Sequence, residues 1–298
     1  MELKFFEIKY GKHEVKIPYY EIIGKSTGPM GFISAGIHGN DLNSINVLRN
    51  FIRVAKTTEL QKKLKGVLII FPILNISGFE NNTRNVFEDG KDLNLQFGKR
   101  TFNNFSSAIA FELSHNFFKK CDFGINFYDC NSTLTCISHP SIVTINELDF
   151  AKNFGSKVIM QKRNNKNLMP NILQKEFGTR ILNIEAGSRS DEITKSVKPL
   201  MQGIRNILIT EKMLDSKSKI LSKHIILNAK SGMRAKKSGI LDLKIELSEK
   251  VSKGQKLGTI FYPQTQKTEV LFAEKAGFIF AKRISKFIKR GQTVFTIL

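Results

Sequence analysis

The stretch Phe32-Ile33-Ser34-Ala35-Gly36-Ile37-His38-Gly39-Asn40-Asp41 carries the first decisive pattern, an apolar run that ends at a glycine and passes into polar residues. Residues 42–55 then place apolar side chains at close to a helical period. The pattern predicts a strand, a tight turn and a helix, with His38 and Asp41 at the carboxyl end of the strand. Open α/β sheets bind ligands at that edge, and an imidazole and a carboxylate directed at one point suit a metal ion.

Asp41 has a second interpretation, because an aspartate directly before a helix commonly caps the helix N-terminus. A histidine followed three residues later by an aspartate is also a short pattern that arises often by chance. A metal site and a helix cap therefore both stay open on these ten residues.

The length and composition are those of an ordinary soluble globular protein. The 298 residues suffice for one large core, or for a core and a small second domain. Apolar runs such as residues 67–71 are too short to span a membrane, and the N-terminus alternates instead of forming a signal-peptide core. Cys121, Cys130 and Cys136 are an odd number in no framework spacing, which favours a reducing cytoplasm. We therefore expect a cytoplasmic protein without a membrane partner.

The formal net charge of +21 raises the possibility of nucleic-acid binding. The basic residues are 36 Lys against 11 Arg, whereas bidentate recognition of phosphates and bases favours Arg. The whole chain is rich in Asn, Ile and Lys, as a compositional bias would make it. A small-molecule substrate is therefore the expected partner, and nucleic acid is not.

Strands and helices alternate along the first two thirds of the chain. Residues 3–10 and 13–22 alternate in polarity around a Tyr-Gly-Lys turn, which predicts an N-terminal hairpin. The polar residues 75–105 predict a long functional loop. Together the patterns predict an α/β sheet covered on both faces, with further strands at 67–71, 123–130, 158–160 and 180–185 and helices at 106–121 and 195–214.

A change in composition near residues 217–219 predicts a linker between two domains, 1–220 and 223–298. Within the second domain, Ser248–Phe261 and Ser285–Leu298 align as a weak internal repeat, each with a turn, a Gly-Gln pair and a strand. Such a repeat predicts a small, pseudo-symmetric all-β module.

The segment Ala35–Asp41, with the sequence AGIHGND, resembles the AGIHGNE signature of the succinylglutamate desuccinylase/aspartoacylase family, a branch of the zinc carboxypeptidase superfamily. The resemblance implies a mixed central sheet flanked by helices, followed by a C-terminal module of the barrel-sandwich, biotinyl-lipoyl-like type. It also implies a zinc-dependent hydrolase (deacylase) that cleaves the amide bond of a small N-acyl substrate.

The resemblance implies three zinc ligands, of which one is changed in kind. His38 matches the family, and Asp41 stands where the family has Glu. Asn131 stands where the family has a histidine, and an amide oxygen is a weaker ligand for zinc than an imidazole. Two alternatives for this third ligand are His139, expected in a surface loop, and the Cys130 thiolate, which strand alternation directs away from the face of Asn131.

The remaining functional positions are also implied by the resemblance. Glu185, in Ile-Glu-Ala-Gly, matches the general acid/base, Arg84 the residue that polarises the scissile carbonyl, and Asn94 a substrate-binding residue. Leu95 stands where the family has the Arg that grips a substrate carboxylate, so N-acyl aspartate and N-succinyl glutamate are expected to be poor substrates. Two hypotheses follow: a working hydrolase with an altered site, or a degenerate pseudoenzyme that keeps the pocket as a binding module.

Overall fold

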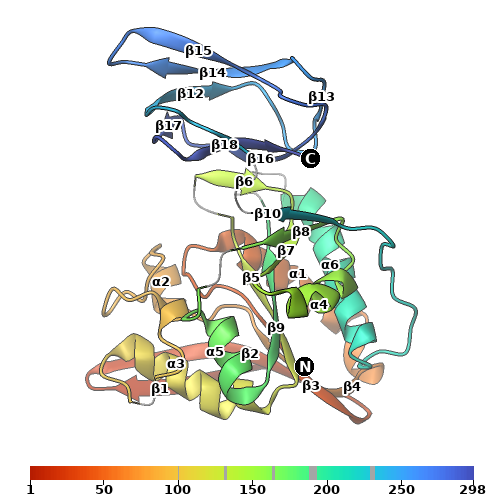
Figure 1. Cartoon of the computed structure of the whole chain (residues 1–298). Coiled ribbons are helices and arrows are strands. Elements are labelled where there is room, and N and C mark those ends of the chain that lie inside the picture. Colours follow the sequence, from red (N-terminus) through yellow and green to blue (C-terminus); the bar gives the residue numbers. More distant parts are fainter. Residues whose placement is uncertain (100, 131–132, 163–164, 188–192, 229–231) are drawn as a thin grey trace.

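The structure is a computed structural model that describes residues 1–99, 101–130, 133–162, 165–187, 193–228 and 232–298. Within these ranges a mixed sheet of nine strands has the order β1-β2-β4-β3-β5-β9-β7-β8-β10 (Figure 1). Its strands are β1 (Leu3–Tyr10), β2 (His13–Ile23), β3 (Ser26–Ser34), β4 (Lys65–Phe71), β5 (Phe123–Tyr128), β7 (His139–Ile142), β8 (Val158–Gln161), β9 (Arg180–Glu185) and β10 (Ile225–Asn228). The predicted N-terminal hairpin is confirmed, since β1 and β2 pair antiparallel from Tyr10–His13 to Leu3–Tyr20.

The large sheet is covered by helices on both faces, because its central strands alternate buried apolar side chains between two cores. On β3, Ile33 belongs to one core and Phe32 to the other. The first core packs against α1 (Leu42–Thr57), α4 (Leu148–Asn153) and α6 (Ile193–Thr210), and the second against α3 (Phe105–Asn116) and α5 (Met169–Phe177). The predicted α/β class is confirmed.

The segment expected to be a long loop contains a short helix, α2 (Ile76–Glu80), and a 3-10 turn at Leu93–Leu95. It is ordered because Leu74, Val86 and Leu93 are completely buried in the second core. Other 3-10 turns lie at Leu60–Lys62, Phe118–Lys120 and Ile145–Glu147.

The C-terminal strands form two further antiparallel sheets around a separate core (Figure 1, blue). One sheet has the order β11-β18-β16-β13 and the other β15-β14-β12-β17. Their bounds are β11 (Met233–Arg234), β12 (Gly239–Leu243), β13 (Lys250–Val251), β14 (Lys256–Tyr262), β15 (Lys267–Phe272), β16 (Gly277–Arg283), β17 (Phe287–Ile288) and β18 (Thr293–Ile297). This is the all-β module that the internal repeat predicts.

The repeat is visible in the turns that precede β14 and β18. In each turn a glutamine Oε1 accepts a hydrogen bond from a backbone N–H three residues earlier: Gln255 from Ser252 (3.0 Å) and Gln292 from Lys289 (2.9 Å). Equivalent short strands, β13 and β17, precede the two turns. The Gly-Gln pair is therefore a device for closing a turn.

Two short strands connect the parts of the chain on either side of the expected linker. β10 follows that linker but pairs with β8 in the large sheet, and β6 (Leu134–Cys136) precedes it but pairs with β16 in the C-terminal module. Residue 223 therefore lies just before a strand of the large sheet, and the first strand of the module is β11. The predicted division into the domains 1–220 and 223–298 stays a prediction. None of the helices in the described ranges has the length and apolar character needed to cross a membrane.

Candidate active site

A polar cavity of about 570 Å³ opens at the carboxyl ends of β3, β5 and β9, the edge at which the sequence places a ligand site. Five of the six predicted site residues line it: His38, Asp41, Arg84, Asn94 and Glu185. The sixth, Asn131, lies outside the described residues. Parallel strands bring these positions together, since β3, β5 and β9 are consecutive neighbours in the sheet.

The turn after β3 is held by close backbone contacts with the segment that leads into α2. Gly36 has a φ of +62°, which favours glycine, and its carbonyl oxygen accepts from the N–H of Asn75 (2.8 Å). A Cβ on Gly39 would lie 2.0 Å from the carbonyl carbon of Gly78, so only glycine fits here. The chain therefore places His38 and Asp41 in one defined position over the sheet edge.

Asp41 occupies the N-cap position of α1, but its side chain makes no capping hydrogen bond, so the interpretation of its carboxylate as the helix cap is wrong. The carboxylate of Asp129, after β5, takes that role: its oxygens accept from the N–H groups of Asn43 (3.0 Å) and Ser44 (2.7 Å). Asp41 instead turns toward His38, with Asp41 Oδ2 2.9 Å from His38 Nδ1. Both side chains are almost fully buried.

His38 lies between two carboxylates. Its Nε2 is 3.5 Å from Oδ1 of Asp92, and the other oxygen of Asp92 accepts a hydrogen bond from the Arg84 guanidinium (3.1 Å). Burial by itself lowers the pKa of His38, but Asp41 and Asp92 outweigh it, so the pKa is raised. For Asp92 the direction is opposite: burial by itself raises its pKa, but His38 and Arg84 hold the pKa below its usual value. We call His38, Asp41, Arg84 and Asp92 the histidine wall of the cavity.

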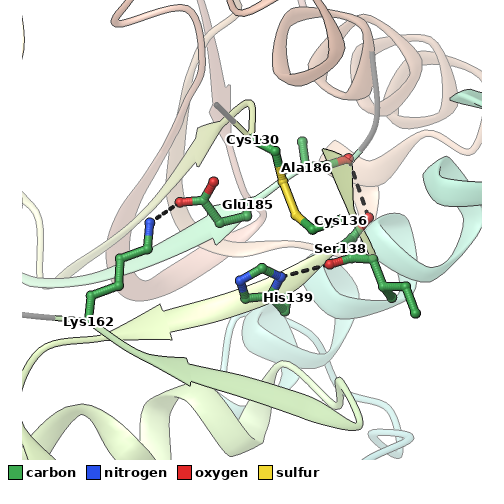
Figure 2. The surroundings of a disulfide bond; sticks show 8 residues. Cys130, Cys136, Ser138, His139, Lys162, Glu185 and Ala186 are labelled. Atoms are coloured by element: carbon green, nitrogen blue, oxygen red, sulfur yellow. Dashed lines mark hydrogen bonds and ion pairs between the residues drawn. A yellow bond between two sulfur atoms is a disulfide. The ribbon is translucent and has the colours of Figure 1, made fainter. Parts of the chain in front are cut away.

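Glu185 ends β9 and is paired with Lys162, which follows β8 (Figure 2). His139 on β7 is its antiparallel neighbour in the sheet. Burial by itself raises the pKa of Glu185, but the Lys162 ammonium, and then His139, reverse the effect and lower it. We call His139, Lys162 and Glu185 the glutamate wall. Glu185 is therefore held ionised.

His139 is not the surface-loop histidine that the sequence suggested. It begins β7, is 3% exposed, and its Nδ1 lies 2.7 Å from the carbonyl oxygen of Ile137. Burial lowers its pKa. Because its neighbour is Glu185, the structure assigns it to the surroundings of the expected base and not to the His38–Asp41 pair.

Cys130 and Cys136 form a disulfide beside Glu185, which corrects the expectation that the cysteines form no framework (Figure 2). Cys121 is free and buried. The Cys130 thiolate is thereby excluded as a metal ligand in this state. The cysteines also no longer argue for a reducing compartment, and the cytoplasmic location stays a prediction without their support.

Asn94 is fixed by the start of α5. Its Oδ1 accepts from the N–H of Met169 (3.1 Å), and the Tyr128 hydroxyl lies 3.5 Å from the same oxygen. The predicted substrate-binding asparagine is therefore positioned by a segment more than seventy residues away, and Tyr128 joins it in lining the cavity.

The described residues include two of the three ligands that the resemblance implies for zinc, His38 and Asp41. A catalytic zinc takes about three protein ligands and leaves one position open. His38 and Asp41 face one another as two such donors, but within the described ranges no group of three His, Cys, Asp or Glu side chains suits a metal ion. A complete site therefore depends on Asn131.

Asp92 and Lys162 are the neighbours that sequence reasoning missed, and His139 was named only as an alternative metal ligand. Asp92 lies two residues before Asn94 and eight residues after Arg84 in the sequence. Its closeness in sequence to these two predicted site residues was the one signal available. Lys162 is one lysine among many, and nothing in its local sequence marks it.

The mixed sheet with two helical layers and a cavity at its strand ends defines an α/β protein with a candidate active site at the carboxyl edge of the sheet. The family model of the succinylglutamate desuccinylase/aspartoacylase catalytic domain matches residues 27–210, more than half of the chain. The chain belongs to that family.

Individual relatives are distant in sequence but cover nearly the whole chain. The chain is 20% identical over 292 residues to the N-alpha-acetyl-L-2,4-diaminobutyric acid deacetylase of Halomonas elongata, covering 93% of this chain and 84% of the relative. Among solved structures it resembles the ectoine utilization protein EutE (DoeB) of Ruegeria pomeroyi in a product-bound form, with a TM-score of 0.78, 20% identity and coverage of 99% and 94%. An aspartoacylase family protein of Mesorhizobium loti gives a TM-score of 0.80, 20% identity and coverage of 99% and 93%. These structures share the fold.

Proposed function

We propose that the protein is a zinc-dependent deacylase that hydrolyses the amide bond of a small N-acyl amino acid. The observation that supports this most is the convergence of His38, Asp41, Arg84, Asn94 and Glu185 on one cavity. The family model is named for a succinylglutamate desuccinylase and an aspartoacylase, and the Halomonas elongata relative is named a deacetylase. These names support hydrolysis of an amide bond here.

Residues of both walls take part in the proposed reaction. Glu185, held as a carboxylate, accepts a proton from the attacking water and passes it to the leaving amine. Arg84, steadied by Asp92, donates to the oxygen of the scissile carbonyl, and Asn94 binds the substrate. His38, Asp41 and Asn131 would hold the zinc ion, which when bound lowers the pKa of a water molecule and polarises a carbonyl.

A direct test measures zinc content and acetate release for the purified chain, with N-acetyl-L-2,4-diaminobutyrate, N-acetylaspartate and N-succinylglutamate as substrates. We expect hydrolysis of the first and little of the other two, because Leu95 has replaced the cation that would hold an acidic side chain. Activity should fall after dialysis against a chelator and return with zinc. Absence of hydrolysis with stoichiometric zinc present would overturn the proposal.

A binding module is the second candidate, and the Lys162–Glu185 ion pair favours it. An ion pair at the expected base suits a pocket that holds a ligand without turning it over. This function predicts saturable binding of an N-acetyl amino acid without release of acetate, which calorimetry and the acetate assay separate.

A further inference from the structure

We propose that Lys162 is the specificity-determining residue that binds the free carboxylate of the N-acyl amino acid and so distinguishes it from a neutral amide. This inference rests on the proposed function, and it concerns the carboxylate on the substrate's α-carbon, not the acidic side chain that Leu95 can no longer pair with.

The lining of the cavity offers few cations for such a role. Among the described lining residues, the lysine and arginine side chains are Arg84 and Lys162. Arg84 is paired with Asp92 on the histidine wall, where the scissile carbonyl is expected. Leu95, at the position of the family's carboxylate-binding Arg, is absent from the described lining. Lys162 is the cation beside Glu185, the residue proposed to protonate the leaving amine.

Lys162 is well placed to bind a second anion without leaving the first. Its backbone is held by a hydrogen bond from its N–H to the carbonyl oxygen of Ile142 (2.8 Å). The Glu185 side chain is 11% exposed and the Lys162 side chain 43%, so the open part of the pair belongs to the lysine. An ammonium has three N–H donors, and the one directed at Glu185 leaves others for a carboxylate in the cavity.

The covalent structure of an N-acyl α-amino acid fits this arrangement. Its amide nitrogen and carboxylate carbon are joined through a single Cα, by two bonds of about 1.5 Å each. A carboxylate on Lys162 therefore brings the amide nitrogen close to Glu185, the residue that must protonate it on departure. A neutral amide can still accept a hydrogen bond from the ammonium, but it brings no negative charge to pair with it, so it binds more weakly and is aligned less well.

The test compares N-acetyl-L-2,4-diaminobutyrate with its primary carboxamide, which has the same acyl group and amine but no carboxylate. Wild-type protein should prefer the acid by about 100-fold or more in kcat/KM, as sites that pair a polar substrate group do. Lys162→Met should reduce the preference to less than about tenfold, chiefly by raising KM for the acid. Lys162→Arg should keep most of it. Lys166→Met, an exposed lysine on the same segment, is the matched control and should behave as wild type.

The ratio of the two substrates is the decisive quantity, because loss of Lys162 also alters Glu185 and thereby affects both reactions. A Lys162→Met protein that keeps the wild-type preference for the acid would overturn the inference and leave the proposed function intact. Calorimetry on Glu185→Gln, with and without Lys162→Met, gives a readout that needs no turnover. Acid binding that is lost with Lys162 supports the inference even if the wild type hydrolyses nothing, which would overturn only the proposed function. Equal binding of acid and carboxamide by Glu185→Gln would overturn the inference.

Discussion

Each of the two walls of the cavity contains a basic side chain paired with a carboxylate, but the walls are assembled from different parts of the chain. The histidine wall comes from residues 36–92, where the turn after β3 packs against the segment around α2. The glutamate wall comes from the ends of β7, β8 and β9, which are neighbours only in the folded sheet. On the first wall an arginine pairs with a carboxylate that supports His38, whereas on the second a lysine pairs with the expected base itself.

The difference shows which wall the family motifs predict and which wall they predict only in part. The histidine wall retains the family pattern with one conservative change, Asp41. The glutamate wall retains Glu185 but surrounds it with a lysine and a buried histidine that no motif announces. We therefore expect substrate selection to depend on the glutamate wall. We expect the histidine wall to determine where in the cavity the reaction takes place.

The largest effect is expected for Glu185→Gln, because the amide cannot accept and return a proton. Hydrolysis of N-acetyl-L-2,4-diaminobutyrate should fall about 10²–10⁴-fold in kcat, measured by acetate release. Glu269→Gln is the control, since Glu269 also pairs with a lysine but lies in the C-terminal module. A Glu185→Gln protein that keeps most of its activity would show that the glutamate wall holds no base.

Gly39→Ala tests how rigidly the histidine wall is built. The added Cβ would lie 2.0 Å from the Gly78 carbonyl carbon and 2.2 Å from the Phe79 nitrogen, and backbone atoms cannot move aside as a side chain can. The free energy of unfolding should fall by about 3 kcal/mol, at the upper end for overpacking. Gly90→Ala has open space and a positive φ, and should cost only about 1 kcal/mol in the same urea titration. Equal losses for both variants would mean that the turn can relax.

Asn131→His tests whether the histidine wall needs only a third ligand. Imidazole is a better zinc donor than an amide oxygen, so zinc affinity should rise at least about tenfold, or 1.4 kcal/mol. Competition with a chromophoric chelator measures the change, and Asn103→His, on an exposed loop, is the control. Unchanged affinity would favour the binding-module function, because the site would then have diverged by more than one residue.

The smallest effect is expected for the stability of Lys162→Met as a function of pH. The folded-state pKa of Glu185 lies below its usual 4.5, so the ion pair stabilises the protein above that pH and the stabilisation is lost as pH falls through the folded-state pKa. Because the lysine is partly exposed, solvent screening limits the loss in the variant to about 1 kcal/mol at pH 7.

Urea denaturation of wild type and Lys162→Met at pH 7 and pH 3.5 measures this dependence. The difference in unfolding free energy should shrink at pH 3.5. Lys236→Met, which removes the lysine of the more exposed pair with Glu269, should give a smaller difference at pH 7. A difference for Lys162→Met that grows on acidification would contradict the direction of the Glu185 pKa.

The sequence by itself determined the strand that ends at Ser34, the tight turn and the helix that follows from residue 42, and the cover of the sheet on both faces. These depend on signals within a short window: an apolar period, or a glycine that permits a turn. Parallel neighbours then carry the ends of the strands to a common edge. That Arg84 and Asn94 join His38 and Glu185 at one site was implied by the resemblance to the family.

Only the tertiary structure decided what surrounds those residues. That Asp129 caps α1 in place of Asp41, that His139 is buried beside Glu185, that Cys130 meets Cys136, and that Lys162 pairs with Glu185 all depend on which strands become neighbours. The order of β5, β9, β7 and β8 is set by the packing of the whole chain, because β9 lies between β5 and β7 in the sheet but follows β8 in the sequence. A lysine is therefore an ordinary surface residue in the sequence and becomes part of the site only when β8 is placed two strands from β9.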